Sequence, residues 1–440
     1  MAIRKICIAL VAIFFTTNLF GQAKSIDERI GEAMNGSDWA GLRDLYLSEG
    51  KDLQTPFMTP LSKFFISQFY NKPDSAIKYG NEILEKYQDE LSSSVPSILY
   101  FMAEDYAALN HYDKASALLH SLNEAYRQAG QPVNPTFEGY EDIYSKLSET
   151  GAFNINKPNH DVHVPLSVHK NEKGSPEMLY IMANINGKNV RCTYDTGAGV
   201  NIMTSEFARN IGAKVIPTKS IQMLGMSHAT SKGLVVLDSL KLGDAVYRNV
   251  PFIVVDIKTD NELANKKFKE LDYSCVIGSQ TMIPLNEICF DFEKMQLTIP
   301  ASCSQTPAYA PNFYRSAQHG LHLLLTDGIS NKRIEGNVDT GAAGSVLTYR
   351  YYKRNEGYFK GKAASDSLRS AGVGGVSVVK TTNVPWSYSV SCKKYELPNI
   401  PVVVSPAQNE DYDCLIGLPL LMSHKKLSIN FKDMWMRFDD

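Results

Sequence analysis

The chain has 440 residues, which exceeds one ordinary domain and predicts two to four. Hydrophobic residues make up 44% of the sequence, enough for packed cores, and no long segment has the composition of a disordered chain. With 45 basic and 47 acidic residues the formal net charge is -2, so neither a nucleic acid nor an anionic membrane surface is expected as a partner.

Residues 1–23 have the pattern of a cleaved secretory signal. Arg4 and Lys5 give a positive start, residues 6–15 form an unbroken apolar run, and the small residues Gly21 and Ala23 precede the first charged cluster. The run is short for a bilayer span, and no later stretch reaches that length. A permanent anchor helix is the alternative. We expect an exported protein, in the periplasm, cell envelope or medium, with no integral membrane segment after signal removal.

Without Cys7, which lies in the predicted signal, six cysteines are left: 192, 275, 289, 303, 392 and 414. An even count in an exported protein permits disulfides, but sequence alone cannot choose among the possible pairings. Cys275 and Cys414 stand in apolar runs at equivalent places of a repeat described below. For these two we expect buried free thiols.

Residues 24–150 are predicted to form an α-helical domain. Apolar residues recur there at spacings of three and four, and Pro73 stands where a helix can start. The stretches 71–76 and 110–115 are similar to each other and resemble the turn and second helix of tetratricopeptide-type repeats. An irregular helical domain is the alternative. Such an array would serve for packing or for binding a protein partner.

The character of the sequence changes near residue 165, where runs rich in Val, Ile, Thr and Tyr alternate with turn signals such as Asn186-Gly187. A polar stretch precedes this change, and Pro300, Pro307 and Pro311 divide the β-rich part in two. The predicted layout is a linker at 151–164, a first lobe at 165–300, an inter-lobe linker at 301–317 and a second lobe at 318–440.

The two β-rich halves are predicted to be copies of one another. The ten residues from Asp195 match the ten from Asp339 at five identical positions, beginning with Asp-Thr-Gly-Ala in both. Roughly eighty residues later each half has a second matching element, 272–278 and 411–417, which ends in two apolar residues and a glycine. One Asp-Thr-Gly means little by chance frequency, but two in matching contexts indicate a duplication.

These motifs resemble the retropepsin-like family of aspartic proteases, and the resemblance covers residues 165–440. It implies an all-β bilobal domain of two related β-barrel lobes, here fused in one chain, with Asp195 and Asp339 as the catalytic pair. It also implies that Thr196 and Thr340 brace the two Asp loops against each other, although ordinary strand packing is the alternative for either threonine. The residues implied to support the site are Thr196, Gly197, Ala198, Thr340, Gly341 and Ala342, with Ile277, Gly278, Ile416 and Gly417 on strands beneath it.

The residue types suit this chemistry without the family name. Hydrolysis of a peptide bond by water needs a base to activate the water and an acid to protonate the carbonyl oxygen. Two adjacent carboxyls cannot both ionise, so they share one proton and supply both roles; aspartic proteases are the standard example. Pepsin-like enzymes usually have Ser or Thr in place of Ala198 and Ala342. An alanine side chain cannot hydrogen-bond the carboxylate, which predicts a higher working pH than that of a gastric-type enzyme.

Two glycine-containing segments at equivalent places resemble the flaps that close such a cleft, because glycine permits a tight bend and motion. A plain hairpin turn is the alternative for each. The predicted flap residues are Gly225 and Met226 in the first half and Gly372, Val373 and Gly374 in the second.

The sequence therefore predicts an exported aspartic endopeptidase acting on peptides or proteins, with neither a cofactor nor a metal. Motifs for zinc, serine-nucleophile or phosphate-loop chemistry are missing from the sequence. One alternative is a non-catalytic scaffold or chaperone that binds peptides in the same cleft. Another is that the helical segment acts as a pro-region that covers the cleft.

Overall fold

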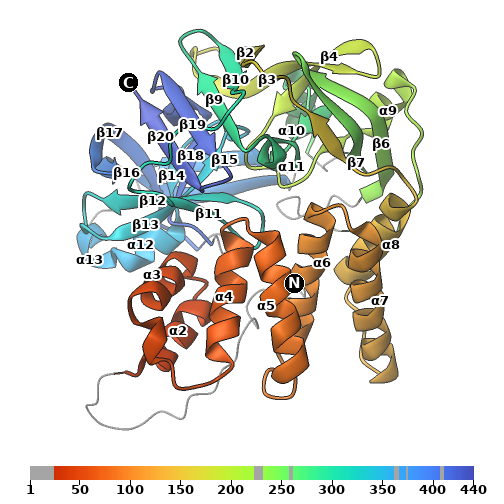
Figure 1. Ribbon diagram of the computed structural model, residues 1–440. Helices are drawn as coiled ribbons and strands as arrows, with labels where there is room; N and C mark the ends of the chain where they lie inside the picture. The colour runs from red at the N-terminus through yellow and green to blue at the C-terminus, as the bar shows by residue number, and fades with distance from the viewer. Residues whose placement is uncertain (1–23, 222–230, 257–260, 361–365, 373–374, 407–410) are drawn as a thin grey trace. The chain divides into compact units, whose positions relative to one another are not determined.

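The computed structural model describes residues 24–221, 231–256, 261–360, 366–372, 375–406 and 411–440 (Figure 1). The predicted signal, residues 1–23, lies outside the described part. The chain divides into two compact units with a boundary between Glu149 and Thr150. In the described part of the chain, no helix has the length and apolarity needed to cross a membrane.

The first unit is helical throughout its described residues. Its elements are α2 (Ile26–Asn35), α3 (Trp39–Glu49), the 3-10 helix η1 (Gly50–Asp52), α4 (Met58–Phe69), α5 (Pro73–Lys86), α6 (Val95–Ala108), α7 (Tyr112–Gln128) and α8 (Pro135–Ser148). Ser25 and Glu28 form a reciprocal capping box that satisfies the first amides of α2. As the sequence indicates, α5 begins at Pro73, where the missing N–H has no helical acceptor to lose.

Two helix–helix turns in this unit have the same backbone. Asn71 and Asn110 both adopt positive φ, 55° and 62°, a conformation that asparagine tolerates better than most residues. Immediately after them, Lys72 N donates to Ser67 O at 2.9 Å and His111 N to Tyr106 O at 2.8 Å. The two similar sequence stretches therefore build the same link, from α4 to α5 and from α6 to α7.

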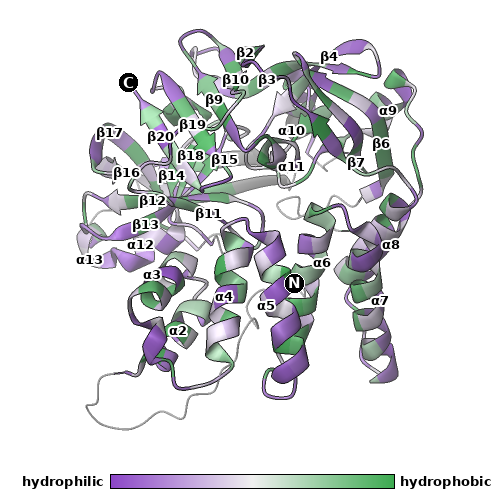
Figure 2. Cartoon of the chain, viewed as in Figure 1, coloured by the Kyte–Doolittle hydropathy of each residue, from purple (hydrophilic) through white to green (hydrophobic). Residues whose placement is uncertain are grey.

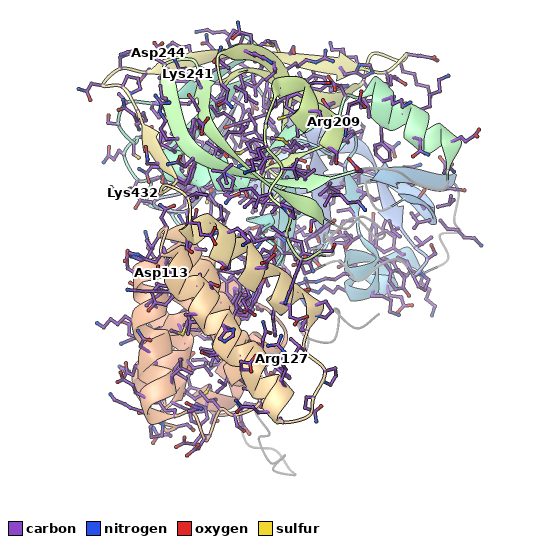
Figure 3. The ribbon with its side chains drawn as sticks, turned by 90° about the vertical axis from the view of Figure 1, so that its right-hand side faces the viewer. Asp113, Arg127, Arg209, Lys241, Asp244 and Lys432 are labelled. Carbon is purple, nitrogen blue, oxygen red and sulfur yellow. The ribbon has the colours of Figure 1, made fainter. Side chains whose placement is uncertain are left out.

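The helices bury one face each. On α7 the buried apolar positions are 112, 115, 119 and 122, spaced by three and four residues as a helical face requires, and the polar Asn123 is buried beside them. Figure 2 shows hydrophobic and hydrophilic residues alternating along this helix, and Figure 3 labels Asp113 and Arg127 near its two ends. Aromatic rings dominate the core nearer the N-terminus, where Trp39 stacks on Phe69 with ring centroids 4.0 Å apart.

The second unit is mostly β-structure. Its elements up to residue 300 are β1 (Asn154–Asn156), β2 (Val162–Lys170), β3 (Pro176–Ile185), β4 (Lys188–Tyr194), β5 (Ile202–Met203), α9 (Ser205–Ile211), β6 (Ser231–Leu242), β7 (Ala245–Val255), α10 (Glu262–Glu270), β8 (Cys275–Ile277), α11 (Ser279–Met282), η2 (Ile283–Leu285), β9 (Glu287–Asp291) and β10 (Gln296–Ile299). Lys241 and Asp244 stand at the turn between β6 and β7 (Figure 3). Both β1 and the start of β2 fall in the stretch predicted as a linker.

The remaining elements belong to the second half. They are β11 (Phe313–Arg315), β12 (Leu321–Asp327), β13 (Arg333–Asp339), β14 (Val346–Leu347), α12 (Tyr349–Arg354), α13 (Glu356–Phe359), β15 (Asp366–Gly372), β16 (Gly375–Val390), β17 (Lys393–Val403), β18 (Cys414–Gly417), α14 (Leu418–Leu421), β19 (Lys426–Asn430) and β20 (Trp435–Asp439). The fold class predicted from the sequence, a helical region followed by a mostly β domain with two sheets, is confirmed.

Each sheet contains a closed ring of six strands. In the first sheet the ring runs β3-β4-β8-β5-β7-β6 and returns to β3; in the second it runs β12-β13-β18-β14-β17-β16 and returns to β12. We call these the first ring and the second ring. In both, the strand that leads to the Asp loop lies parallel to the strand of the repeated element, which ends at Gly417 in the second ring and one residue before Gly278 in the first. The short strand after each Asp loop pairs antiparallel with that same strand, Met203 opposite Cys275 and Leu347 opposite Cys414.

The last two strands of each half join in one sheet. The hairpin of β9 and β10 meets the hairpin of β19 and β20 through antiparallel pairing of β9 with β19, which places Glu287 opposite Asn430 and Asp291 opposite Lys426. The hairpin turns match, since Met295 and Met434 both have positive φ. Asn430 Nδ2 donates to the buried Glu287 carboxylate at 2.8 Å, so a polar contact also joins the halves.

Candidate active site

Asp195 and Asp339 occupy the same position in the two rings. Asp195 directly follows β4, and its amide donates to Ile277 O of β8 at 3.0 Å. Asp339 is the last residue of β13 and pairs with Gly417 of the parallel strand β18. Because parallel neighbours bring strand ends to one edge, each aspartate lies directly beside the apolar-apolar-glycine element of its own half.

The two carboxyls lie against each other's loops. A Cβ atom built on Gly197 would stand 2.5 Å from Asp339 Cγ, and one built on Gly341 would stand 2.5 Å from Asp195 Oδ2. Only glycine leaves room for this approach. Each glycine amide in turn donates to Oδ1 of its own aspartate at 2.8 Å. The structure thus brings the two predicted aspartates together, with one glycine on either side.

Thr196 and Thr340 hold the two loops through four reciprocal hydrogen bonds. Thr196 Oγ1 donates to Val338 O at 2.9 Å, and Thr340 Oγ1 donates to Tyr194 O at 2.8 Å. Each hydroxyl also accepts the backbone amide of the other threonine at 3.0 Å. Both side chains are fully buried. Both threonine hydroxyls and both threonine amides are therefore used in hydrogen bonds between the two loops.

The strands beneath the dyad contact the loops through backbone atoms. Ser279 N donates to Ala198 O at 2.7 Å and Leu418 N to Ala342 O at 2.8 Å. Gly278 N donates to Asn201 Oδ1 and Gly417 N to Ser345 Oγ, both at 2.9 Å. A Cβ on Gly278 would meet Val200 O and Ala198 O within 2.6 Å, so glycine is needed for close approach here as well.

Burial sets the electrostatics of the aspartate pair. It raises the pKa of both carboxyls, and for Asp339 the negative charge of Asp195 raises the pKa further, well above the ordinary range. Hydrogen bonds from the Gly197 and Gly341 amides act in the opposite direction because they favour the charged forms. The two carboxyls therefore titrate as a coupled pair, and the two pKa values belong to the pair and not to one aspartate each.

Two residues near the dyad were not among the predicted site residues. Burial raises the pKa of the Tyr273 hydroxyl, and the charges of Asp195 and Asp339 raise it further. His319, in the turn between β11 and β12, has a Cβ 2.6 Å from where a Cβ on Gly199 would stand. Tyr273 could have been found, since it belongs to the repeated element 272–278; nothing in the sequence points to His319.

Most of the predicted flap residues lie outside the described part: Gly225, Met226, Val373 and Gly374. In the second half the adjoining backbone is described, and β15 pairs antiparallel with β16 from Asp366–Thr381 up to Gly372–Gly375. The hairpin geometry there fits either a flap or a plain turn, so the flap assignment stays a prediction.

A further polar cluster links β2, β3 and α10. Ligand atoms of His169, Glu177 and Glu270 lie within 4.8 Å of one another, the only such group in the described residues. Lys267 Nζ donates to Glu177 at 2.7 Å and to Glu270 at 3.1 Å. Because Lys267 forms ion pairs with both carboxylates, the cluster is an ion-pair network that ties α10 to the first ring.

One family model matches the first half of the site. The family model described as "Aspartyl protease" matches residues 181–278, from β3 through the Asp195 loop to the glycine beneath it. No curated protein matches. Among solved structures, Basic 7S globulin from soybean matches with 9% identity and a TM-score of 0.37, covering 64% of this chain and 95% of that one. An aspartic proteinase from Irpex lacteus matches with 13% identity and a TM-score of 0.37, covering 63% and 97%.

The threonine cluster generates a stability prediction. Thr196→Ala removes the donor to Val338 O and the acceptor of the Thr340 amide, leaving two buried polar groups unsatisfied. We expect the free energy of unfolding to fall by about 2 kcal/mol or more, measured by urea denaturation. Thr196→Ser keeps the hydroxyl and is the matched control, with a clearly smaller loss. Equal losses in both variants would contradict the role of the hydrogen bonds.

Proposed function

We propose that this protein is an aspartic endopeptidase in which Asp195 and Asp339 activate a water molecule against a peptide carbonyl. The observation that carries the proposal is the opposition of the two carboxyls, each against the glycine of the other loop. The aspartyl protease model that spans residues 181–278 supports it from the first half of the site.

In the proposed mechanism, the pair uses its shared proton for both halves of the reaction. The ionised carboxylate accepts a proton from the water, which attacks the carbonyl carbon, while the protonated carboxyl donates to the carbonyl oxygen. The proton taken from the water then goes to the leaving amine as the C–N bond breaks. One hydroxyl of the tetrahedral intermediate returns its proton to the aspartate pair, which leaves a carboxylic acid product and a pair that again holds one proton. Because the two carboxyls are coupled, neither aspartate is assigned a fixed role.

We further propose that the two halves arose by duplication and that each supplies half of the site. The matched ring order, the equal strand registers beside the two aspartates and the common hairpin turns support this. A directly fused pair of lobes would complete the dyad within one chain, without a second copy.

The remaining proposals concern the context of the reaction. The signal-like residues 1–23 motivate export to the periplasm, cell envelope or medium, where the substrate would be a peptide or protein. The shared turn geometry at Asn71 and Asn110 supports a tetratricopeptide-like helical unit. Such a unit would bind a protein partner.

The dyad is tested by replacing each carboxyl with its isosteric amide. Purified wild type, Asp195→Asn and Asp339→Asn would be incubated with a denatured protein mixture from acid to neutral pH, and new peptide ends read by mass spectrometry. We expect cleavage by the wild type and a loss of at least about a hundredfold in each variant, because a proton-transfer group is removed. Unchanged cleavage in either variant would exclude the mechanism. Absence of cleavage by the folded wild type would favour a peptide-binding role instead.

The close approach of the loops is tested by two alanine substitutions in one loop. Gly341→Ala places a Cβ against the Asp195 carboxyl and must displace it, whereas a Cβ on Gly344 would meet nothing within 4 Å. We expect kcat to fall by about a hundredfold for Gly341→Ala, as for a misplacement of roughly 1 Å, and to change little for Gly344→Ala. Retention of full activity by Gly341→Ala would show that the carboxyls need not be in contact.

The direction of the pKa shifts predicts the pH at which activity is lost on the alkaline side of the pH–rate profile. Since burial raises the pKa of both aspartates, the shared proton is lost only above the ordinary range of carboxyl groups, and activity should persist to correspondingly higher pH. Ala198→Ser and Ala342→Ser each introduce a hydroxyl that can stabilise the charged pair. We expect them to move the alkaline limb of the pH–rate profile to lower pH, by about one unit. A limb that stays in place, or moves upward, would contradict this account.

A further inference from the structure

The strand pair beneath the Asp195 loop carries two cysteines in contact. Thr193 of β4 pairs with Val276 of the parallel strand β8, which makes Cys192 and Cys275 neighbours across the same two strands. Their sulfur atoms lie 3.2 Å apart, and both side chains are fully buried. A disulfide bond is about 2.05 Å long, so a movement of roughly 1 Å separates this contact from a covalent link.

The second ring has one sulfur at the corresponding place. Cys414 of β18 is equivalent to Cys275 and is also buried, but its neighbour on β13 is Gly336. A Cβ on Gly336 would stand 2.9 Å from Cys414 Sγ, so the thiol fills the space that a side chain on β13 would need. The pair of thiols is therefore specific to the first ring, in a fold whose two rings otherwise match strand for strand.

We propose that Cys192 and Cys275 form a disulfide when the chain folds in an oxidising environment. The two thiols lose two protons and two electrons as the S–S bond forms. A small-molecule or protein disulfide accepts the electrons, passing through a mixed disulfide, and leaves as two thiols. The link would join β4 three residues before Asp195 to β8 three residues before Gly278.

The position of the pair determines when this link can form. Burial raises the pKa of the Cys275 thiol well above its ordinary value, and its hydrogen bond with Cys192 raises the pKa further. The thiolate that must attack the oxidant is therefore scarce in the folded protein. Exchange takes place while the first ring is still open, and closure of the ring then shields the disulfide from reductants. The proposal is independent of whether the dyad hydrolyses peptides.

Peptide mapping of the full chain tests the link. The protein would be unfolded and refolded either with a mixture of reduced and oxidised glutathione or with dithiothreitol, and free thiols alkylated after denaturation. Trypsin releases Cys192 in peptide 192–209, but peptide 270–294 carries both Cys275 and Cys289. A second digestion after glutamate cleaves at Glu287 and separates these two cysteines. We expect a Cys192–Cys275 peptide pair after oxidative refolding and none after refolding with dithiothreitol.

Stability provides the second readout, with a matched control in the other ring. Oxidative refolding should raise the urea midpoint of the wild type and of Cys414→Ser, in which the equivalent lone thiol is removed. The same comparison should show no such shift in Cys192→Ser. If Cys192 and Cys275 are both recovered alkylated from the glutathione-refolded wild type, or are linked to other cysteines, the proposal is wrong. This mapping needs no variant, so it decides the question even if Cys192→Ser fails to fold.

Discussion

The reciprocal hydrogen bonds of Thr196 and Thr340 are the constraint on which the candidate site depends. Two carboxyls on loops of separate rings have no intrinsic reason to meet, and they repel each other once both are charged. The four buried hydrogen bonds fix the loops because any relative movement would leave hydroxyls, amides and carbonyls unsatisfied away from water. Gly197 and Gly341 have no side chain, so each carboxyl can lie in contact with the opposite loop.

Holding the aspartates together works against folding at neutral pH. Both have a folded-state pKa raised above the unfolded value. Their contribution to stability is therefore fully present below the unfolded pKa and is lost as the pH rises through the folded pKa. The rest of the unit has to offset this cost. The sheet shared by β9 and β19, with its Glu287–Asn430 contact, ties the halves together far from the dyad in sequence, and apolar packing in both rings supplies the bulk of the stability.

Features that depend on local sequence patterns could be predicted from the sequence. Helical periodicity located the first unit, Pro73 and Asn110 marked true element boundaries, and the repeated Asp-Thr-Gly-Ala located both dyad loops. Features that depend on contacts between distant parts of the chain could not be predicted from the sequence. The burial of Cys275 was predicted, but its sulfur neighbour Cys192 depends on the parallel register of β4 with β8. His319 lies beside Gly199 only because a turn of the second half meets a loop of the first.

The residue types of the two halves agree at the two aspartate loops but differ on the neighbouring strands β3 and β12. Tyr180 pairs with Thr193 in the first ring, and His322 pairs with Asn337 at the same place in the second. Tyr180 donates to Leu271 O at 2.6 Å within an apolar cluster, whereas His322 lies 3.2 Å from Tyr314 Oη and 3.6 Å from Asp411 Oδ1. Burial lowers the pKa of that imidazole, which keeps it neutral at neutral pH. Two carboxyls share a proton evenly only when their immediate partners are alike, so this requirement falls on the loops and the threonines. The side chains behind them do not share this requirement. The two halves are therefore identical in Asp-Thr-Gly-Ala and different in the strand that lies behind each aspartate.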